Sequence, residues 1–377
     1  MKISLGAVIT EKRKEKKVTQ QELADFVGVS KAAVSKWETG QTYPDITLLP
    51  LLAAYFDVSI DSLLDYEPEL NQQEIQRIYL SLQKSFQTKS AEEVLQSIES
   101  FIHRYYSCYP FLLQMGNLLL NHYDLLPGEN PLEKQQRYIP KALDLFIRVR
   151  SNSKEVAVMD EAMKMQAYCL LILNRPDDVL AILGEYVPPY LPSDSLIAGA
   201  FQLKGATDQA LATTQNGIFQ NLFVLLSGLT NYLPLLVKEP IRFTETYQRG
   251  AGLITLFQAE KINPAALLNF YLSGAVGYAQ IGDKAALFAI LEKVCQLLEI
   301  NPVLQFMPND YFDRIQEWLN TQALAGQTPR EANTVVESVI AFILTNPLLL
   351  PYREEEKMRE IFQRIEEVKE ERKNERK

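Results

Sequence analysis

Apolar residues recur at every third and fourth position along nearly the whole chain, and no stretch from residue 71 onward alternates strictly as a half-buried strand would. This spacing predicts an all-α protein. The first 64 residues carry a first helix over 1–17, two short helices within 19–40, a helix beginning near Asp45 or Thr47, and a closing helix at 59–64. Further helices are expected at about 71–88, 91–107, 110–125, 133–150, 154–173, 177–187, 193–235 in two or three pieces, 240–260, 264–281, 283–299, 309–325, 329–345 and 352–373.

The segment from Asp65 to Asn71 is polar, contains Pro68 and follows the last residue that a small N-terminal core would need. We place a domain boundary there. The expected organisation is an N-terminal domain over 1–66, a linker over 67–72, a large helical domain over 73–350 and a charged capping helix over 351–377.

Internal repeats decide the architecture of the large domain. The stretch from Ala275 to Pro302 resembles a tetratricopeptide repeat, with a helix, a Gly-Asp turn, an alanine-rich second helix and a proline. A weaker copy lies at 167–183, and weaker second-helix starts lie at Ser90, Pro140, Asp208 and Pro329. The intervals between these segments vary around the ~34 residues of that repeat and do not keep a fixed period. A degenerate, tetratricopeptide-like solenoid of helical hairpins is the favoured interpretation, and an irregular helical domain stays open as the alternative.

The stretch TQQELADFVGVSKAAVSKWETG, from Thr19 to Gly40, has the most specific spacing in the chain. Thr19 followed three residues later by Glu22 is typical of a capping box, and Gly28 follows as a helix end. Ser30 is a second N-cap candidate, and the helix after it ends before Gly40. Two short helices joined through a glycine turn are typical of a helix-turn-helix unit, whose second helix lies in the major groove of DNA.

At these residues the sequence resembles the Cro/repressor-type (XRE) helix-turn-helix family, in the runs TQQELA, GVS and VSKWETG, and the resemblance covers about 3–64. It implies a compact five-helix domain that binds double-stranded DNA. In that family the residue at Gln20 donates to a phosphate, those at Lys31, Ala32 and Lys36 reach base edges, and those at Ser35 and Thr39 lie near the backbone. The candidate DNA-binding residues are Gln20, Gln21, Ser30, Lys31, Ala32, Ala33, Ser35, Lys36 and Thr39.

Ala32 and Ala33 depart from the family, in which many members carry Gln or Arg at base-reading positions. A methyl group can contact a thymine methyl but cannot form a bidentate hydrogen bond. Readout is therefore expected to depend on Lys31, Lys36 and DNA shape.

The formal net charge of −9 is unevenly distributed. Residues 1–40 hold eight basic against five acidic side chains, which gives +3 there and −12 for the rest. Positive charge thus gathers where phosphates would be met, while the acidic remainder disfavours non-specific binding along DNA. The basic run from Lys12 to Lys17 is either a phosphate-binding surface or a solvated helix face.

The sequence contains no recognisable motif for catalysis, metal binding or cofactor binding. The two histidines, His103 and His122, lack metal-site spacing, the three cysteines form no CxxC pair, and no phosphate-binding glycine loop is present. We expect no catalytic site, no metal and no cofactor. Without a signal peptide or an apolar run of about 18 residues, the protein is expected to be cytoplasmic with no membrane partner.

A helical solenoid on a Cro-type head resembles, in architecture, the cytoplasmic peptide-pheromone-sensing regulators of Gram-positive bacteria. The resemblance implies a short signalling peptide on the inner face of the solenoid, often held by asparagines, and a homodimer. Asparagine is a poor helix former, so asparagines inside helices are candidates for this role. They are Asn117, Asn121, Asn216, Asn221, Asn231 and Asn269.

Two functions follow from this organisation. The first is a dimeric transcription regulator whose solenoid senses a peptide and so controls DNA binding. The second is a non-enzymatic adaptor whose solenoid binds a protein partner, with the N-terminal domain as a tether to DNA.

Overall fold

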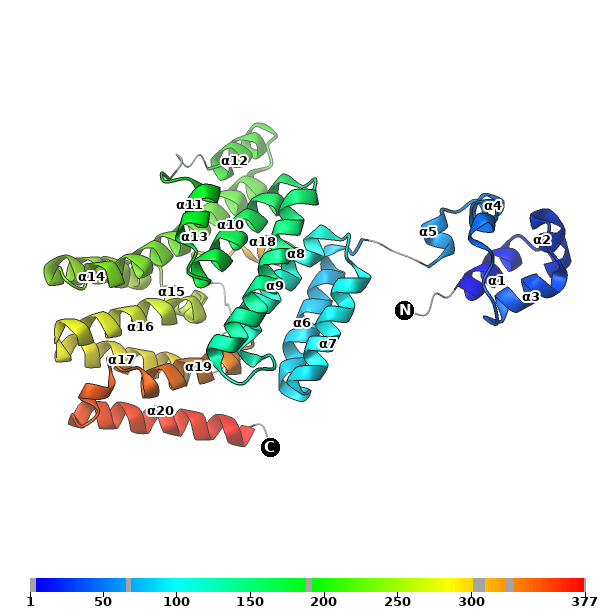
Figure 1. Ribbon diagram of the computed structural model, residues 1–377. Coiled ribbons are helices and arrows are strands. Elements are labelled where there is room, and N and C mark those ends of the chain that lie inside the picture. Colours follow the sequence, from blue (N-terminus) through cyan, green and yellow to red (C-terminus); the bar gives the residue numbers. More distant parts are fainter. Residues whose placement is uncertain are drawn as a thin grey trace.

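The computed structural model describes residues 5–65, 69–187, 192–300, 309–322, 324 and 328–375, and all regular structure within these ranges is helical (Figure 1). The all-α prediction is therefore confirmed. The buried apolar side chains form three clusters: one in the N-terminal domain, one in the first half of the body and one in its second half.

The N-terminal domain, which we call the head, contains five short α-helices. Its core is made by Ile9, Leu23, Val34 and Leu52, all fully buried, together with Trp37. The helices are α1 (Leu5–Glu15), α2 (Gln20–Val27), α3 (Lys31–Glu38), α4 (Leu49–Phe56) and α5 (Ile60–Leu63), with a 3-10 turn η1 (Ile46–Leu48) before α4.

Local capping explains where α2 and α3 begin and end. The Thr19 hydroxyl accepts from the backbone N–H of Glu22, whose carboxylate accepts from the Thr19 N–H in return, so the predicted capping box is present. Gly28 ends α2 in the left-handed conformation, with φ 73°, which an L side chain rarely adopts. Ser30 then caps α3 through the N–H of Ala33.

The first half of the body packs six helices around one core that includes Tyr79, Phe111, Tyr138 and Phe146. Neighbouring helices pair as hairpins, most extensively α8 with α9 and α9 with α10. The helices are α6 (Gln72–Thr88), α7 (Ala91–Arg104), α8 (Tyr109–His122), α9 (Pro131–Asn152), α10 (Val156–Ile172) and α11 (Pro176–Leu183), with a 3-10 turn η2 (Tyr123–Leu125) between α8 and α9.

The second half of the body continues with longer helices that lie in successive rows in Figure 1, from α16 through α17 to α20. The last helix packs on α17 and α19, as expected of a helix that covers one end of the stack. The elements are α12 (Asp194–Leu203), α13 (Thr207–Tyr232), η3 (Leu233–Leu236), α14 (Pro240–Leu256), α15 (Ala259–Ile262), α16 (Pro264–Ile281), α17 (Lys284–Ile300), α18 (Gln316–Thr321), α19 (Ala332–Thr345), η4 (Leu350–Tyr352) and α20 (Glu356–Glu375).

The hairpin predicted around Gly282 and Asp283 is present as α16 and α17. Gly282 has φ 87°, and the Asp283 carboxylate accepts from the N–H of Ala286 to start the second helix. Two details differ from the sequence prediction. Pro140 lies inside α9 and starts no helix, because the buried residues Ile139 and Ala142 on either side of it belong to the same continuous helix. Within 309–325 the described residues contain only the short helix α18.

Candidate DNA-binding surface and ligand cleft

Helix α3 presents one face to solvent and buries the other. Val34 and Trp37 are buried against the head core, while Lys31, Ala32 and Lys36 are exposed. Ser35 and Ala33 are half-buried, and Ser30 and Thr39 at the helix ends are exposed. The predicted DNA-reading positions Lys31, Ala32 and Lys36 therefore lie on one accessible side of α3.

Several of the candidate DNA-binding side chains already have partners within the head. The Gln21 amide donates to Asp25 at 2.7 Å, and the Thr39 hydroxyl donates to the Ser35 carbonyl at 2.9 Å. The Gln20 amide nitrogen donates to the carboxylate of Glu38 at 2.8 Å. Since an amide nitrogen carries two hydrogens, Gln20 keeps a second donor for a phosphate.

A buried ion pair holds α3 against α1. Arg13 donates to both carboxylate oxygens of Glu38, at 2.5 and 3.0 Å, and the two side chains are 13% and 7% exposed. Burial alone would raise the pKa of Glu38, but the hydrogen bonds from Arg13 and Gln20 and the positive charges nearby hold it below its ordinary value. Arg13, Gln20 and Glu38 therefore join α1, α2 and α3.

Three side chains of the basic run at the end of α1 have carboxylate partners within the head. Arg13 turns inward, Lys12 pairs with Glu15 at 2.8 Å, and Lys16 pairs with Asp57 at 2.8 Å. Only Arg13 is buried in its pair, whereas the pairs of Lys12 and Lys16 are exposed. Both interpretations of the run, a phosphate-binding surface and a solvated helix face, therefore stay predictions.

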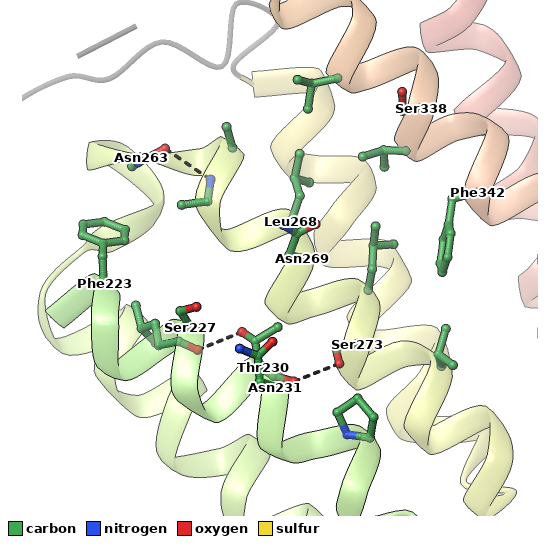
Figure 2. A pocket seen from close by; sticks show the side chains of 18 of the residues that line it. Phe223, Ser227, Thr230, Asn231, Asn263, Leu268, Asn269, Ser273, Ser338 and Phe342 are labelled. Carbon is green, nitrogen blue, oxygen red and sulfur yellow. Dashed lines mark hydrogen bonds between the residues drawn. The ribbon is translucent and has the colours of Figure 1, made fainter. Parts of the chain in front are cut away.

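The second half of the body contains a cleft of about 1030 Å³ (Figure 2). One face each of α13, α16 and α19 forms its walls, and residues 328–330 with Asn121 close one end. The lining positions follow helical spacing, with Phe223, Leu226, Ser227, Thr230, Asn231 and Pro234 from α13 and its end, Ala265, Leu268, Asn269, Leu272, Ser273 and Val276 from α16, and Val335, Ser338, Val339 and Phe342 from α19.

The cleft combines apolar walls with a few uncharged polar groups. Asn231 of α13 and Asn269 of α16 are exposed, line the cleft (Figure 2), and have no hydrogen-bond partner for their side-chain amides among the described residues. Ser273 and Thr230 link the two helices instead, through a bond of 3.2 Å from the serine hydroxyl to the threonine carbonyl. Two amides are thus free to bind a ligand.

The six candidate asparagines separate into two groups. Asn121, Asn231 and Asn269 line the cleft. Asn117 lies near Glu161, with 3.4 Å between its amide nitrogen and the carboxylate, Asn216 holds a side-chain oxygen that is buried without a partner among the described residues, and Asn221 is exposed outside the cleft lining. Sequence reasoning missed Asn263, Thr230, Ser273 and the other lining residues, although polar residues spaced by three and four along 223–234 were an available signal.

Arg330 is the one charged residue among those that line the cleft. Its guanidinium donates to Asp124 at 2.8 Å, so the pair leaves this end of the cleft nearly neutral. Beside it His122 is buried, and burial lowers the pKa of His122 to about 4. His122 Nδ1 lies 2.9 Å from the Leu118 carbonyl, a contact that opposes the lowering, but the burial outweighs it and the ring is neutral near pH 7.

The segment from Thr328 to Arg330 connects the cleft to α6, the first helix of the body. The Gln83 amide donates to the Thr328 and Pro329 carbonyls, each at 2.9 Å, and the Tyr79 hydroxyl donates to the Pro329 carbonyl at 3.1 Å. A wall of the cleft is thereby held by the helix that follows the segment leading from the head.

Residues 9–63 match the family model described as helix-turn-helix. The HTH-type transcriptional activator BcrR of Enterococcus faecalis is 44% identical over 55 residues, which are 15% of this chain and 27% of BcrR. The HTH-type transcriptional regulator SinR of Bacillus subtilis is 41% identical over 66 residues, which are 17% of this chain and 60% of SinR. The chain thus spans about a quarter of the length of BcrR and three fifths of that of SinR, and each similarity covers a small part of this chain.

Among solved structures, the apo form of ComR from S. thermophilus aligns with 81% of this chain and 96% of its own, at 14% identity and a TM-score of 0.26. The apo form of the competence regulator ComR from Streptococcus vestibularis aligns with a TM-score of 0.25, at 15% identity over 87% of this chain and 99% of its own. TM-scores this low establish no common fold for the body.

Proposed function

Because residues 9–63 form a helix-turn-helix domain like those of named transcription regulators, we propose that the chain is a DNA-binding transcription regulator whose helical body binds a short peptide. The head is the part that binds DNA, through the exposed face of α3. The body is the part that senses the ligand, and the cleft between α13, α16 and α19 is the observation that carries this half of the proposal.

The chemistry of the cleft favours a peptide backbone as the ligand. An asparagine side chain offers a C=O acceptor and an NH₂ donor. These two groups can pair with the N–H and the C=O of a peptide backbone. Asn231 and Asn269 are both free to pair in this way. The apolar lining then accommodates apolar side chains, and the neutral Arg330–Asp124 end disfavours a strongly charged ligand.

The size of the cleft supports a ligand larger than a metabolite. Sites for drug-sized molecules occupy ~300–1,000 Å³, and this cleft, at about 1030 Å³, lies at the upper limit. A short, mostly apolar peptide is the ligand that fits both the volume and the free amides.

A change in the cleft can reach the head through the segment from Thr328 to Arg330. A peptide that shifts this wall would strain the hydrogen bonds that Gln83 and Tyr79 of α6 make with it. Because α6 follows the segment that leads from the head, its movement would alter how the heads are presented to DNA. The regulator acts as a homodimer in the cytoplasm, since two recognition helices on two half-sites supply specificity that one helix lacks.

A thermal-shift screen with synthetic octapeptides rich in Leu, Ile, Phe and Val tests the ligand class. We expect particular peptides to raise the melting temperature, and the rise to be lost in the double variant Asn231→Ala/Asn269→Ala. Asn117→Ala is the matched control, because Asn117 lies outside the cleft lining, and it should keep the rise. A screen in which every peptide leaves the melting temperature unchanged, or a rise that survives the double variant, would remove the peptide from the proposal and favour the adaptor function.

A further inference from the structure

Helix α13 has a second apolar surface on the side away from the cleft. Leu211, Ile218, Leu225 and Tyr232 are spaced by seven residues and are 48%, 37%, 51% and 41% exposed. Between them lie Thr214, Asn221 and Gly228, which are also exposed. These seven positions have the a and d spacing of a helix that packs along another helix, and we call them the α13 seam.

The seam and the cleft lie on opposite sides of α13. At ~100° per residue, Ser227 and Phe223 project about 160–200° away from Leu225. Both of these residues line the cleft, whereas the seam residues lie outside its lining. One helix therefore carries the ligand-facing residues on one side and an uncovered apolar row on the other.

Gly228 has no function within the chain that explains it. A glycine inside a helix costs about 1 kcal/mol relative to alanine. A Cβ built at Gly228 meets nothing within 4 Å, so no close approach inside the chain requires its small size. A large side chain from a second helix would fill the open space beside Gly228.

We propose that the α13 seam is the contact between two copies of this chain, packed antiparallel about a twofold axis. In antiparallel packing the large a residues of one helix lie opposite the small d residues of the other. With the axis between Ile218 and Asn221, Leu211 lies opposite Gly228 of the second copy, Leu225 opposite Thr214, and Ile218 opposite Asn221. Each large side chain thus meets a small one, and the same surface serves both copies, as a twofold interface requires.

Charge and composition favour a second copy over a lipid bilayer. Thr207–Leu236 is long and apolar enough to cross a membrane, and only 22% of its most apolar window is buried. Its one charged residue, Asp208, lies in the first turn outside the seam, so two seams bring no like charges together. However, Phe219, Leu222 and Leu226 on other sides of α13 are buried in the core of the second half of the body, and α13 also packs on α16, so the helix is tied to the body.

The area of the seam indicates a weak contact that DNA reinforces. A face of 22 residues is about 33 Å long and about 10 Å wide, which is smaller than the ~800 Å² per partner of a stable complex. Helix α12 packs beside α13 and adds exposed Leu196, Ile197 and Leu203. Two heads on adjacent half-sites supply the remaining stabilisation by raising the effective concentration of the bodies. This inference rests on the proposed function in one respect, namely that a dimer binds DNA.

Cysteine cross-linking of the full chain tests the seam, because the native Cys108, Cys169 and Cys295 are all buried. With a short bismaleimide and DNA selected from a random pool, Asn221→Cys should form a covalent dimer. Gln220→Cys, which is also exposed but points away from the seam at nearly the same height on the helix, is the matched control and should remain a monomer. Leu211→Cys should not link to itself, since antiparallel packing separates its two copies by about 25 Å along the axis. Mixed with Gly228→Cys, it should form a dimer.

Equal cross-linking of Asn221→Cys and Gln220→Cys, self-linking of Leu211→Cys, or no linking in any sample would overturn the proposed seam contact. A second variant guards against misfolding. Ile218→Glu/Leu225→Glu changes only exposed positions and should keep the melting temperature and the peptide-induced rise while losing the dimer. Flotation of the unaltered protein with phosphatidylcholine–phosphatidylglycerol vesicles, in place of dimerisation, would assign the surface to a membrane and contradict the proposal. If the cross-linking contradicts the seam contact but the peptide still raises the melting temperature, the proposed function is unaffected.

Discussion

The Arg13–Glu38 pair should dominate the stability of the head. Glu38→Gln keeps the size of the side chain and removes its charge, which leaves the Arg13 guanidinium beside a neutral amide. Removal of one partner from a fully buried pair costs about 3–5 kcal/mol. Arg13 and Glu38 retain 13% and 7% exposure, so some solvent remains available. We therefore expect a loss of about 2–3 kcal/mol in the free energy of unfolding of the head.

The assay uses the buried Trp37 as a reporter of the head. The chain has two tryptophans, so Trp318→Phe in the background leaves Trp37 as the only one. For a domain of this size the urea m-value is about 1 kcal/mol per molar, so the midpoint should fall by about 2–3 M. Glu15→Gln, which breaks the exposed pair with Lys12, is the control and should leave the midpoint unchanged.

Two results would refute this reasoning. One is a midpoint for Glu38→Gln equal to that of Glu15→Gln. The other is an Arg13→Met/Glu38→Gln double variant that is less stable than Glu38→Gln alone, because removal of the orphaned guanidinium should restore part of the loss.

The remaining predictions concern DNA binding, pH and coupling. Lys31→Ala/Lys36→Ala should lower affinity for selected DNA at least about tenfold and reduce its salt dependence, with Lys164→Ala as the control in a gel-shift assay. His122 has a pKa of about 4 in the folded chain against 6.5 for the free side chain. Stability of the body should therefore be full above pH ~7 and fall by about 1.4 kcal/mol per pH unit from pH ~6.5 to ~4; urea unfolding of His122→Asn should lack this slope. Gln83→Leu should leave peptide-induced melting shifts intact while reducing the effect of peptide on DNA affinity.

The helix-turn-helix unit was predictable because its signals are local. Thr19, Glu22, Gly28 and Ser30 fix the ends of two helices through hydrogen bonds and one left-handed residue, all within a few positions. The apolar period likewise located the body helices, including the hairpin at Gly282.

The residues of the cleft were less predictable because they depend on how each helix is rotated against its neighbours. Asn221 and Asn231 lie on the same helix, yet only Asn231 lines the cleft. Arg13 shows the same limit in the head. Within a basic run its neighbours look equivalent in sequence, and only the packing of α1 on α3 turns Arg13 toward Glu38.

The coupling between cleft and head is tested most directly by the affinity of the full chain for selected DNA, measured with and without a saturating octapeptide from the thermal-shift screen. We expect the peptide to change that affinity severalfold or more in the unaltered protein and in Asn117→Ala, and to leave it unchanged in Asn231→Ala/Asn269→Ala. The same DNA affinity with and without bound peptide would contradict control of the head by the body.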